Sequence, residues 1–167
     1  MSLPLIDTRF MLTFLTDLLN TPSPTGFAHR AIDYTERALQ DFPDLQLSKT
    51  RKGALVARWA GESVDGLRAL TAHADTLGAM VKEIKTNGRL KLTQIGHYAW
   101  NTVEGEGCTI FTRNGQQLRG SLLIEKASGH VYGKDVADTP REDKNMELRL
   151  DARTASPEET RQLGIEG

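Results

Sequence analysis

The sequence predicts a mixed α/β chain in two parts. Residues 1–77 are expected to form the N-terminal part of an α/β domain, and residues 78–167 a small all-β part of barrel or PDZ-like type. Apolar residues recur at the helical period of 3.6 up to about residue 40. The period then changes to two, and short runs separated by Asn-Gly and other glycine turns fill the second part. Such runs are typical of a small barrel or sandwich, not of repeated βαβ units.

Two helices are expected near the N-terminus. Asp7 can cap the first, because its carboxylate can accept a hydrogen bond from an N–H group of the first turn. Residues 21–26 end this helix, since two prolines and a glycine disfavour a helix interior. A second helix is expected over residues 27–40 and stops before Pro43. The apolar residues that set the period of the first helix are Phe10, Met11, Phe14, Leu15, Leu18 and Leu19.

Three strands are expected before residue 78. Leu45 and Leu47 alternate with polar residues, and a turn at Lys52-Gly53 leads into a second strand over 54–59. Residues 67–72 are short and mostly apolar. They predict a strand that is buried on both faces inside an α/β sheet.

Five short strands are expected in the second part, and turn signals separate several of them. The turn signals are Asn87-Gly88, residues 105–107 and Asn114-Gly115. Ser156 and Pro157 then predict a short helix that ends at Gly164, with Glu159 completing a capping box. The expected strands cover residues 79–84, 89–92, 108–112, 120–124 and 146–150.

Composition and charge exclude several classes of function. A net charge of −1 and a pI near 6.4 lack the cationic excess of a nucleic-acid surface. No apolar run reaches the roughly 20 residues that span a bilayer, and no secretory signal is recognisable. The single cysteine, Cys108, cannot form an intramolecular disulfide. We expect Cys108 to be a small buried residue beside a strand, and the chain to work in the cytoplasm.

His73 and Asp75 are the candidate functional residues. They follow the predicted buried strand and lie two residues apart, so their side chains should project to the same side. Ligands of open α/β sheets bind just outside the carboxyl ends of the strands. Imidazole is a common ligand of zinc and cobalt, and a carboxylate can accept its second N–H. The spacing alone leaves open whether His73 binds a metal or has a structural role.

The residues around this pair resemble the M42 family of metallo-aminopeptidases, the glutamyl aminopeptidase or TET-type enzymes. TAHADTLGAMV at residues 71–81 resembles the family signature AHxDxxGxMV. His97 departs from the family pattern, because a second glycine is expected after Gly96. Further similar segments occur in order along the chain, at residues 22–26, 52–55, 87–90, 95–96, 120–122, 145–151 and 164–167.

The resemblance implies an enzyme with an α/β catalytic domain that is interrupted by a β-rich dimerisation domain. Family members remove N-terminal residues from peptides with two divalent metal ions, zinc or cobalt, and many assemble from dimers into dodecamers. It implies that His73 is a ligand of one metal and that Asp75 is its catalytic, orienting partner. The family's other ligands and its glutamate base lie after the inserted domain. The chain by itself is therefore expected to be inactive.

The remaining candidates form no second ligand cluster. His29 is expected on the solvated face of a helix, His97 on a loop surface, and His130 in a strand of the second part with a structural or interface role. Glu104 and Glu106 flank a turn glycine and are expected to be solvated.

Two other functions compete with a metallo-aminopeptidase. The chain could be a non-catalytic module whose β part mediates self-association. It could also be an M20-type amidohydrolase or deacetylase, since that family shares a His-x-Asp strand end. Against the M20 type, strands follow His73 almost at once, and DTLGAMV at residues 75–81 resembles the M42 family more closely.

Overall fold

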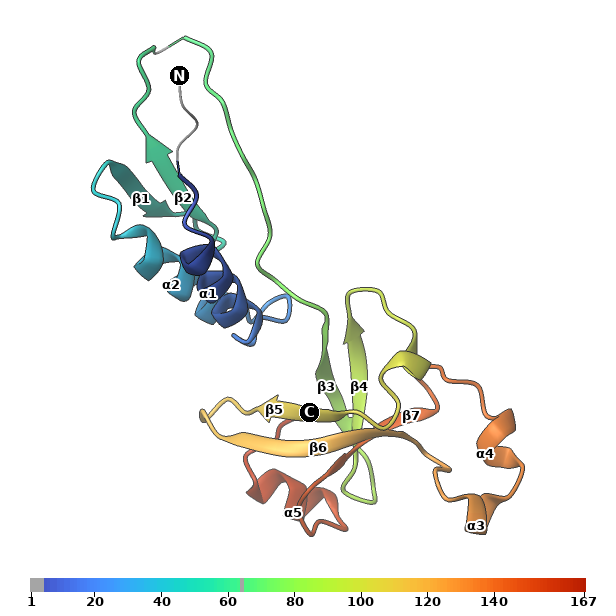
Figure 1. The fold of residues 1–167 in the computed structure, drawn as a ribbon. Coiled ribbons are helices and arrows are strands. Elements are labelled where there is room, and N and C mark those ends of the chain that lie inside the picture. The colour runs from blue at the N-terminus through green and yellow to red at the C-terminus, as the bar shows by residue number, and fades with distance from the viewer. Residues whose placement is uncertain (1–4, 64) are drawn as a thin grey trace. The chain divides into compact units, whose positions relative to one another are not determined.

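A computed structural model describes residues 5–63 and 65–167 of the chain. Two compact units divide it, Met1–Thr76 and Leu77–Gly167, and each is described below by itself. The first combines helices with a two-stranded sheet, and the second is built on a five-stranded antiparallel sheet (Figure 1). The chain is therefore a mixed α/β protein, as its hydrophobic periods predict.

Both predicted helices of the first unit are present. Helix α1 spans Thr8–Leu19, and the Asp7 carboxylate caps it by accepting the Phe10 N–H at 3.0 Å. Helix α2 spans His29–Leu39. Strands β1 (Leu45–Lys49) and β2 (Leu55–Trp59) pair antiparallel with each other. Figure 1 shows the two helices side by side, with β1 next to α2.

The first unit buries few apolar side chains. Among its described residues, Ala31 is the only buried hydrophobic one. Helix α1 has no buried residue, although its apolar residues recur at the helical period that the sequence predicts. The exposed large apolar residues of this helix are Phe10, Met11, Leu12, Leu15 and Leu19.

The predicted buried strand over residues 67–72 is wrong. The structure assigns no strand there, and Leu67 and Leu70 are 92% and 103% exposed. A buried strand needs hydrogen-bonding neighbours along its edges and packed layers on its faces. In the described part of this unit, β1 and β2 pair only with each other, so residues 67–72 have no strand to join.

The second unit contains all five predicted strands. They are β3 (Gly78–Ile84), β4 (Leu90–Ile95), β5 (Gly107–Phe111), β6 (Gln117–Ile124) and β7 (Met146–Leu150). Their order in the sheet is β3-β4-β7-β6-β5. Strand β7, the last in the sequence, therefore lies between the β3–β4 hairpin and the β5–β6 hairpin. The sheet curls but has two ends, β3 and β5, so the strand pairing does not close into a barrel among the described residues.

Short helices also belong to this unit, so it is not purely β. A 3-10 turn, η1, spans Trp100–Thr102, and α5 spans Pro157–Gln162. Two four-residue helices, α3 (Gly129–Tyr132) and α4 (Asp135–Asp138), lie between β6 and β7. The expectation of a strand around His130 is therefore wrong. The four residues close a single helical turn after Ser128, whose carbonyl accepts the N–H groups of Val131 and Tyr132.

The hydrophobic core of the chain lies in this second unit. Alternate residues of β4, β6 and β7 point to one face of the sheet, as a period of two requires. The buried cluster consists of Leu90, Leu92, Trp100, Ile110, Leu122, Ile124, Met146, Leu148, Leu150 and Ile165.

Helix α5 fastens the β3–β4 turn. Ser156 caps this helix as predicted, accepting the Glu159 N–H at 3.3 Å. The Glu159 carboxylate accepts the N–H of Ala155 at 2.6 Å instead of the Ser156 N–H that a capping box would use. The buried hydroxyl of Thr160 donates to the Gly88 carbonyl at 2.7 Å. Gly88 has a φ of 77°, which suits glycine at the end of a tight turn.

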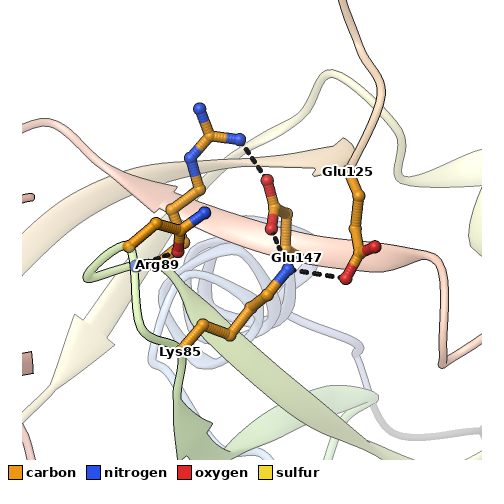
Figure 2. Close-up of polar contacts among 5 residues, drawn as sticks. Lys85, Arg89, Glu125 and Glu147 are labelled. Atoms are coloured by element: carbon orange, nitrogen blue, oxygen red, sulfur yellow. Dashed lines mark hydrogen bonds and ion pairs between the residues drawn. The ribbon is translucent and has the colours of Figure 1, made fainter.

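One carboxylate inside this unit is buried and fully paired. Glu147 of β7 is 1% exposed, and its two oxygens accept from Lys85 and from Arg89 (Figure 2). Lys85 Nζ also donates to Glu125 at 2.5 Å. Figure 2 shows the ammonium of Lys85 between the two carboxylates. The network connects the β3–β4 turn to the ends of β6 and β7.

Candidate metal-ligand pair

The structure brings His73 and Asp75 into direct contact. The Nδ1 atom of His73 lies 3.2 Å from Oδ1 of Asp75 and 3.0 Å from the Asp75 carbonyl oxygen. Residues 72–75 are not in a strand, so this contact does not come from strand alternation. The His73 side chain is 86% exposed, so no crevice encloses the imidazole in the described residues.

The loop between α1 and α2 pairs with this segment through backbone hydrogen bonds. A parallel bridge joins Pro24 to Thr76. The Thr76 N–H donates to the Ser23 carbonyl at 2.8 Å, and the Thr25 N–H donates to the Thr76 carbonyl at 3.3 Å. The prolines and glycine of residues 22–26 keep this loop out of both helices, so its backbone groups are free to pair.

Two hydroxyl groups of the same loop reach residues 74 and 75. The buried Ser23 side chain donates to the Ala74 carbonyl at 2.8 Å. The Thr25 hydroxyl donates to Oδ2 of Asp75 at 2.5 Å. Sequence reasoning missed both residues, since fifty residues separate Thr25 from its partner and no local spacing signals the contact. The only trace in the sequence is the similarity of residues 22–26 to the M42 loop.

These contacts favour the ionised form of Asp75. The hydrogen bond from Thr25 lowers the pKa of the carboxyl group below its usual value; the backbone N–H and His73 act in the same direction, against a smaller opposing effect of burial. An ionised Asp75 offers only acceptors. The two oxygens that face Nδ1 of His73 are therefore both acceptors, which favours a proton on Nδ1 and leaves the Nε2 lone pair for a ligand.

The pair fits part of a metal site. One imidazole with a supporting carboxylate matches a single ligand and its outer-shell partner. Catalytic zinc sites normally have three protein ligands. In the part of the chain that the structure describes, no group of three or more His, Cys, Asp or Glu side chains could hold a metal ion. This segment alone offers one imidazole whose Nδ1 faces two oxygens of Asp75.

The other histidines lie apart from any such group. His29 is exposed at the start of α2 and meets the Phe27 ring edge-on at 4.7 Å. His97 is exposed in the loop after β4, and His130 is exposed on α3.

Glu104 differs from the solvated residue that the sequence predicts. It is half-buried and forms a two-point ion pair with Arg141, at 2.7 and 3.0 Å. Arg141 also donates to the carbonyls of Val136 and Thr139, so the pair fixes the segment between α4 and β7. Glu106 is exposed as expected. Within residues 5–63 and 65–167, neither glutamate joins a group of three or more possible metal ligands.

No helix in the described residues is both long and apolar enough to cross a membrane.

Comparison with known proteins gives consistent matches. The family model for M42 glutamyl aminopeptidase matches residues 53–167. YhfE of Bacillus subtilis (strain 168), which is assigned as an aminopeptidase, is 41% identical over 157 residues, or 94% of this chain and 45% of that protein.

Solved structures of peptidases are similar in fold. The aminopeptidase APDkam598 from the archaeon Desulfurococcus kamchatkensis matches with a TM-score of 0.78 and 20% identity, over 94% of this chain and 42% of that one. The TET1 peptidase of Pyrococcus horikoshii, which can assemble into a tetrahedron or a large octahedral shell, matches with a TM-score of 0.68 and 20% identity, over 93% and 44%. The chain thus spans less than half the length of each of these relatives.

Proposed function

Because the chain belongs to the M42 glutamyl aminopeptidase family, we propose that it is part of a metal-dependent aminopeptidase that removes N-terminal residues from peptides. The observation that carries this proposal is the His73–Asp75 contact, held by the loop of residues 22–26. We propose that residues 1–77 belong to the catalytic domain and that residues 78–167 form the inserted, self-associating domain.

In this proposal His73 contributes one ligand through Nε2. Asp75 holds the other ring nitrogen by accepting a hydrogen bond from Nδ1–H, which fixes the tautomer and makes the imidazole a stronger ligand. When bound, a pair of zinc or cobalt ions would polarise the scissile carbonyl and activate a water molecule. In this chain, His73 would bind one metal ion and Asp75 would orient the His73 ring. The general base and the remaining ligands are expected in the part of the relatives that the chain does not span.

The complete protein is proposed to act as a homo-oligomer in the cytoplasm. The assemblies named for the Pyrococcus horikoshii TET1 peptidase support an oligomer. A single, half-buried cysteine is compatible with a reducing compartment. An M20-type amidohydrolase is not proposed, since the family match is to M42.

The test is the substitution His73→Ala in a protein that contains this chain and has the full length of the relatives. Hydrolysis of aminoacyl substrates is expected to be lost together with metal content, because one metal loses a ligand. His130→Ala, the same substitution at an exposed histidine of α3, is the matched control and should retain both. Retention of activity and of metal content by His73→Ala would contradict the proposal.

A second measurement tests the ligand count. The 167-residue chain alone should bind zinc no more tightly than about micromolar, since it offers one oriented imidazole and not three ligands. Calorimetric titration with zinc measures this. Tight, stoichiometric binding by the chain alone would show that the site is more complete than proposed.

A further inference from the structure

We propose that Thr25 is a positioning residue for the His73–Asp75 pair: its hydroxyl fixes the carboxylate of Asp75, which in turn fixes the tautomer and orientation of the His73 ring. The inference rests on the proposed function only where it treats His73 as a metal ligand. The contacts of Thr25 with Asp75 and of Asp75 with His73 do not depend on a bound metal.

The two oxygens of Asp75 have different partners. Oδ2 accepts the Thr25 hydroxyl at 2.5 Å, and Oδ1 faces Nδ1 of His73 at 3.2 Å. The Asp75 side chain is about one-third exposed, so without Thr25 it is free to rotate toward water. A carboxylate held at Oδ2 keeps Oδ1 turned toward the imidazole. Thr25 thus acts on His73 through Asp75 without touching the ring.

Thr25 is itself held by the backbone. Its N–H donates to the Thr76 carbonyl, and the Thr76 N–H donates to the Ser23 carbonyl, so Thr25 and the residue two positions before it are tied to the segment that carries Asp75. The Ser23 hydroxyl adds a bond to the Ala74 carbonyl. The loop therefore pairs with the residues immediately before and after Asp75. The backbone that carries the Thr25 hydroxyl is thus paired directly beside Asp75.

The expected consequence is a tautomer preference at His73. Two acceptors, the Asp75 carbonyl and Oδ1, face Nδ1. Loss of the Thr25 hydroxyl leaves the carbonyl in place but frees the carboxylate. The preference for a proton on Nδ1 should therefore weaken without vanishing. Outer-shell partners of metal-bound histidines typically contribute about 10–100-fold to metal affinity, and a partner one bond further out should contribute near the lower end of that range.

The first experiment reads the tautomer directly. Ring nitrogen chemical shifts of the 15N-labelled chain are measured by NMR at about pH 8, above the ordinary histidine pKa of about 6.5. In the unmodified chain, His73 should have a protonated Nδ1. The histidines outside the pair, His29, His97 and His130, serve as internal references.

Two kinds of variant separate the hydroxyl from the rest of the side chain. Thr25→Val keeps the shape and removes the donor, and it should shift His73 toward the Nε2-protonated form while the three reference histidines stay unchanged. Thr25→Ser keeps a hydroxyl and should restore the original pattern. Thr25→Ala is a second variant without a donor, in case valine disturbs the loop. An unchanged His73 tautomer in folded Thr25→Val or Thr25→Ala would overturn the proposal.

The second experiment measures metal affinity in a protein of the relatives' full length. Thr25→Val should bind zinc about tenfold more weakly, and Thr25→Ser should bind it nearly as tightly as the unmodified protein. Equal affinity of all three proteins would overturn the role of Thr25 in metal binding. If the unmodified protein binds no metal while the tautomer still depends on Thr25, the proposed function fails and the positioning role stands.

Discussion

Lys85 and Glu147 are joined by a 2.5 Å ion pair although 62 residues separate them in the sequence. Lys85 follows β3, and Glu147 lies in β7, which is separated from β3 in the sheet by β4. Glu147 is buried, whereas Lys85 keeps 22% of its side chain exposed and has a second carboxylate in Glu125. Removing one partner of a buried pair usually destabilises a protein strongly, because the other charge stays without compensation.

Replacement of Glu147 should therefore destabilise the second unit. Glu147→Ala is expected to lower the free energy of unfolding by about 3 kcal/mol, since Lys85 and Arg89 lose their shared buried acceptor. Glu125→Ala is the matched control and should cost less than about 1 kcal/mol, because the Glu125 side chain is 44% exposed.

Tryptophan fluorescence can report this unit selectively. Trp100 lies in its core, and the other tryptophan, Trp59, is exposed in the first unit. Urea unfolding in a Trp59→Phe background therefore follows the second unit through Trp100. Equal effects of Glu147→Ala and Glu125→Ala would contradict a special role for the buried carboxylate.

The same network predicts a loss of stability at high pH. Burial lowers the pKa of Lys85, but its hydrogen bonds to Glu125 and Glu147 outweigh this effect, so the pKa lies above the ordinary 10.5. A group whose pKa is raised by folding contributes its full stabilisation below the unfolded pKa and loses it as the pH rises through the folded pKa. The contribution of Lys85 should thus be constant up to about pH 10 and fall above it.

Paired variants isolate this contribution. Lys85→Met should be less stable than the unmodified chain near about pH 8, and the difference should shrink toward about pH 11. Lys82→Met, at an exposed lysine of β3, should show no comparable pH-dependent difference. Urea unfolding across this range measures both. A difference for Lys85→Met that stays constant to pH 11 would exclude the raised pKa.

Glycine substitutions should separate backbone strain from close packing. Gly88 and Gly115 both have positive φ, 77° and 84°, so alanine is strained at either position. A Cβ at Gly88 would lie 3.0 Å from the Ser156 carbonyl oxygen and from the Thr160 hydroxyl, whereas a Cβ at Gly115 meets nothing within 4 Å. Gly115→Ala should cost about 1 kcal/mol and Gly88→Ala about 3 kcal/mol, by urea unfolding. Similar losses of stability for the two variants would mean that α5 shifts easily to make room for the Cβ at position 88.

The thiol of Cys108 should react slowly. It lies in β5, is half-buried and contacts the Gly120 carbonyl at 3.5 Å, and burial raises its pKa above the ordinary value. Labelling by a disulfide reagent at about pH 8 should be at least about tenfold slower than at a cysteine placed at Arg113 in a Cys108→Ser chain. Arg113 is a suitable control because its side chain is 87% exposed. Comparable rates would show that β5 opens readily.

Elements with strong local signals could be predicted from the sequence. The Asp7 cap, the Ser156-Pro157 start of α5 and the five strands of the second unit all occur where the residues indicate them. Each depends on groups a few residues apart. The errors have the opposite character: residues 67–72 have a strand-like composition but no partner, and His130 lies in a helical turn within a segment that carries little hydrophobic pattern.

The candidate site shows the same limit. His73 and Asp75 are adjacent enough for the sequence to predict that they meet, and they do. The contact does not arise from alternation along a strand, as the sequence suggests, since no strand forms at residues 72–75. The Thr25 hydroxyl on Asp75 could not be predicted, because a contact across fifty residues depends on where the loop and the segment lie in the folded unit.

Caps, turns and short-range spacing are encoded by neighbouring residues, so the family resemblance, most of the local elements and the His73-x-Asp75 pair can be predicted from the sequence. Three features are known only from the folded chain: β7 lies between β4 and β6, Glu147 is buried between two cations, and the Thr25 hydroxyl donates to Asp75. These features depend on distant segments meeting in space. Burial and long-range hydrogen bonding are properties of the packed chain, and no local pattern carries them.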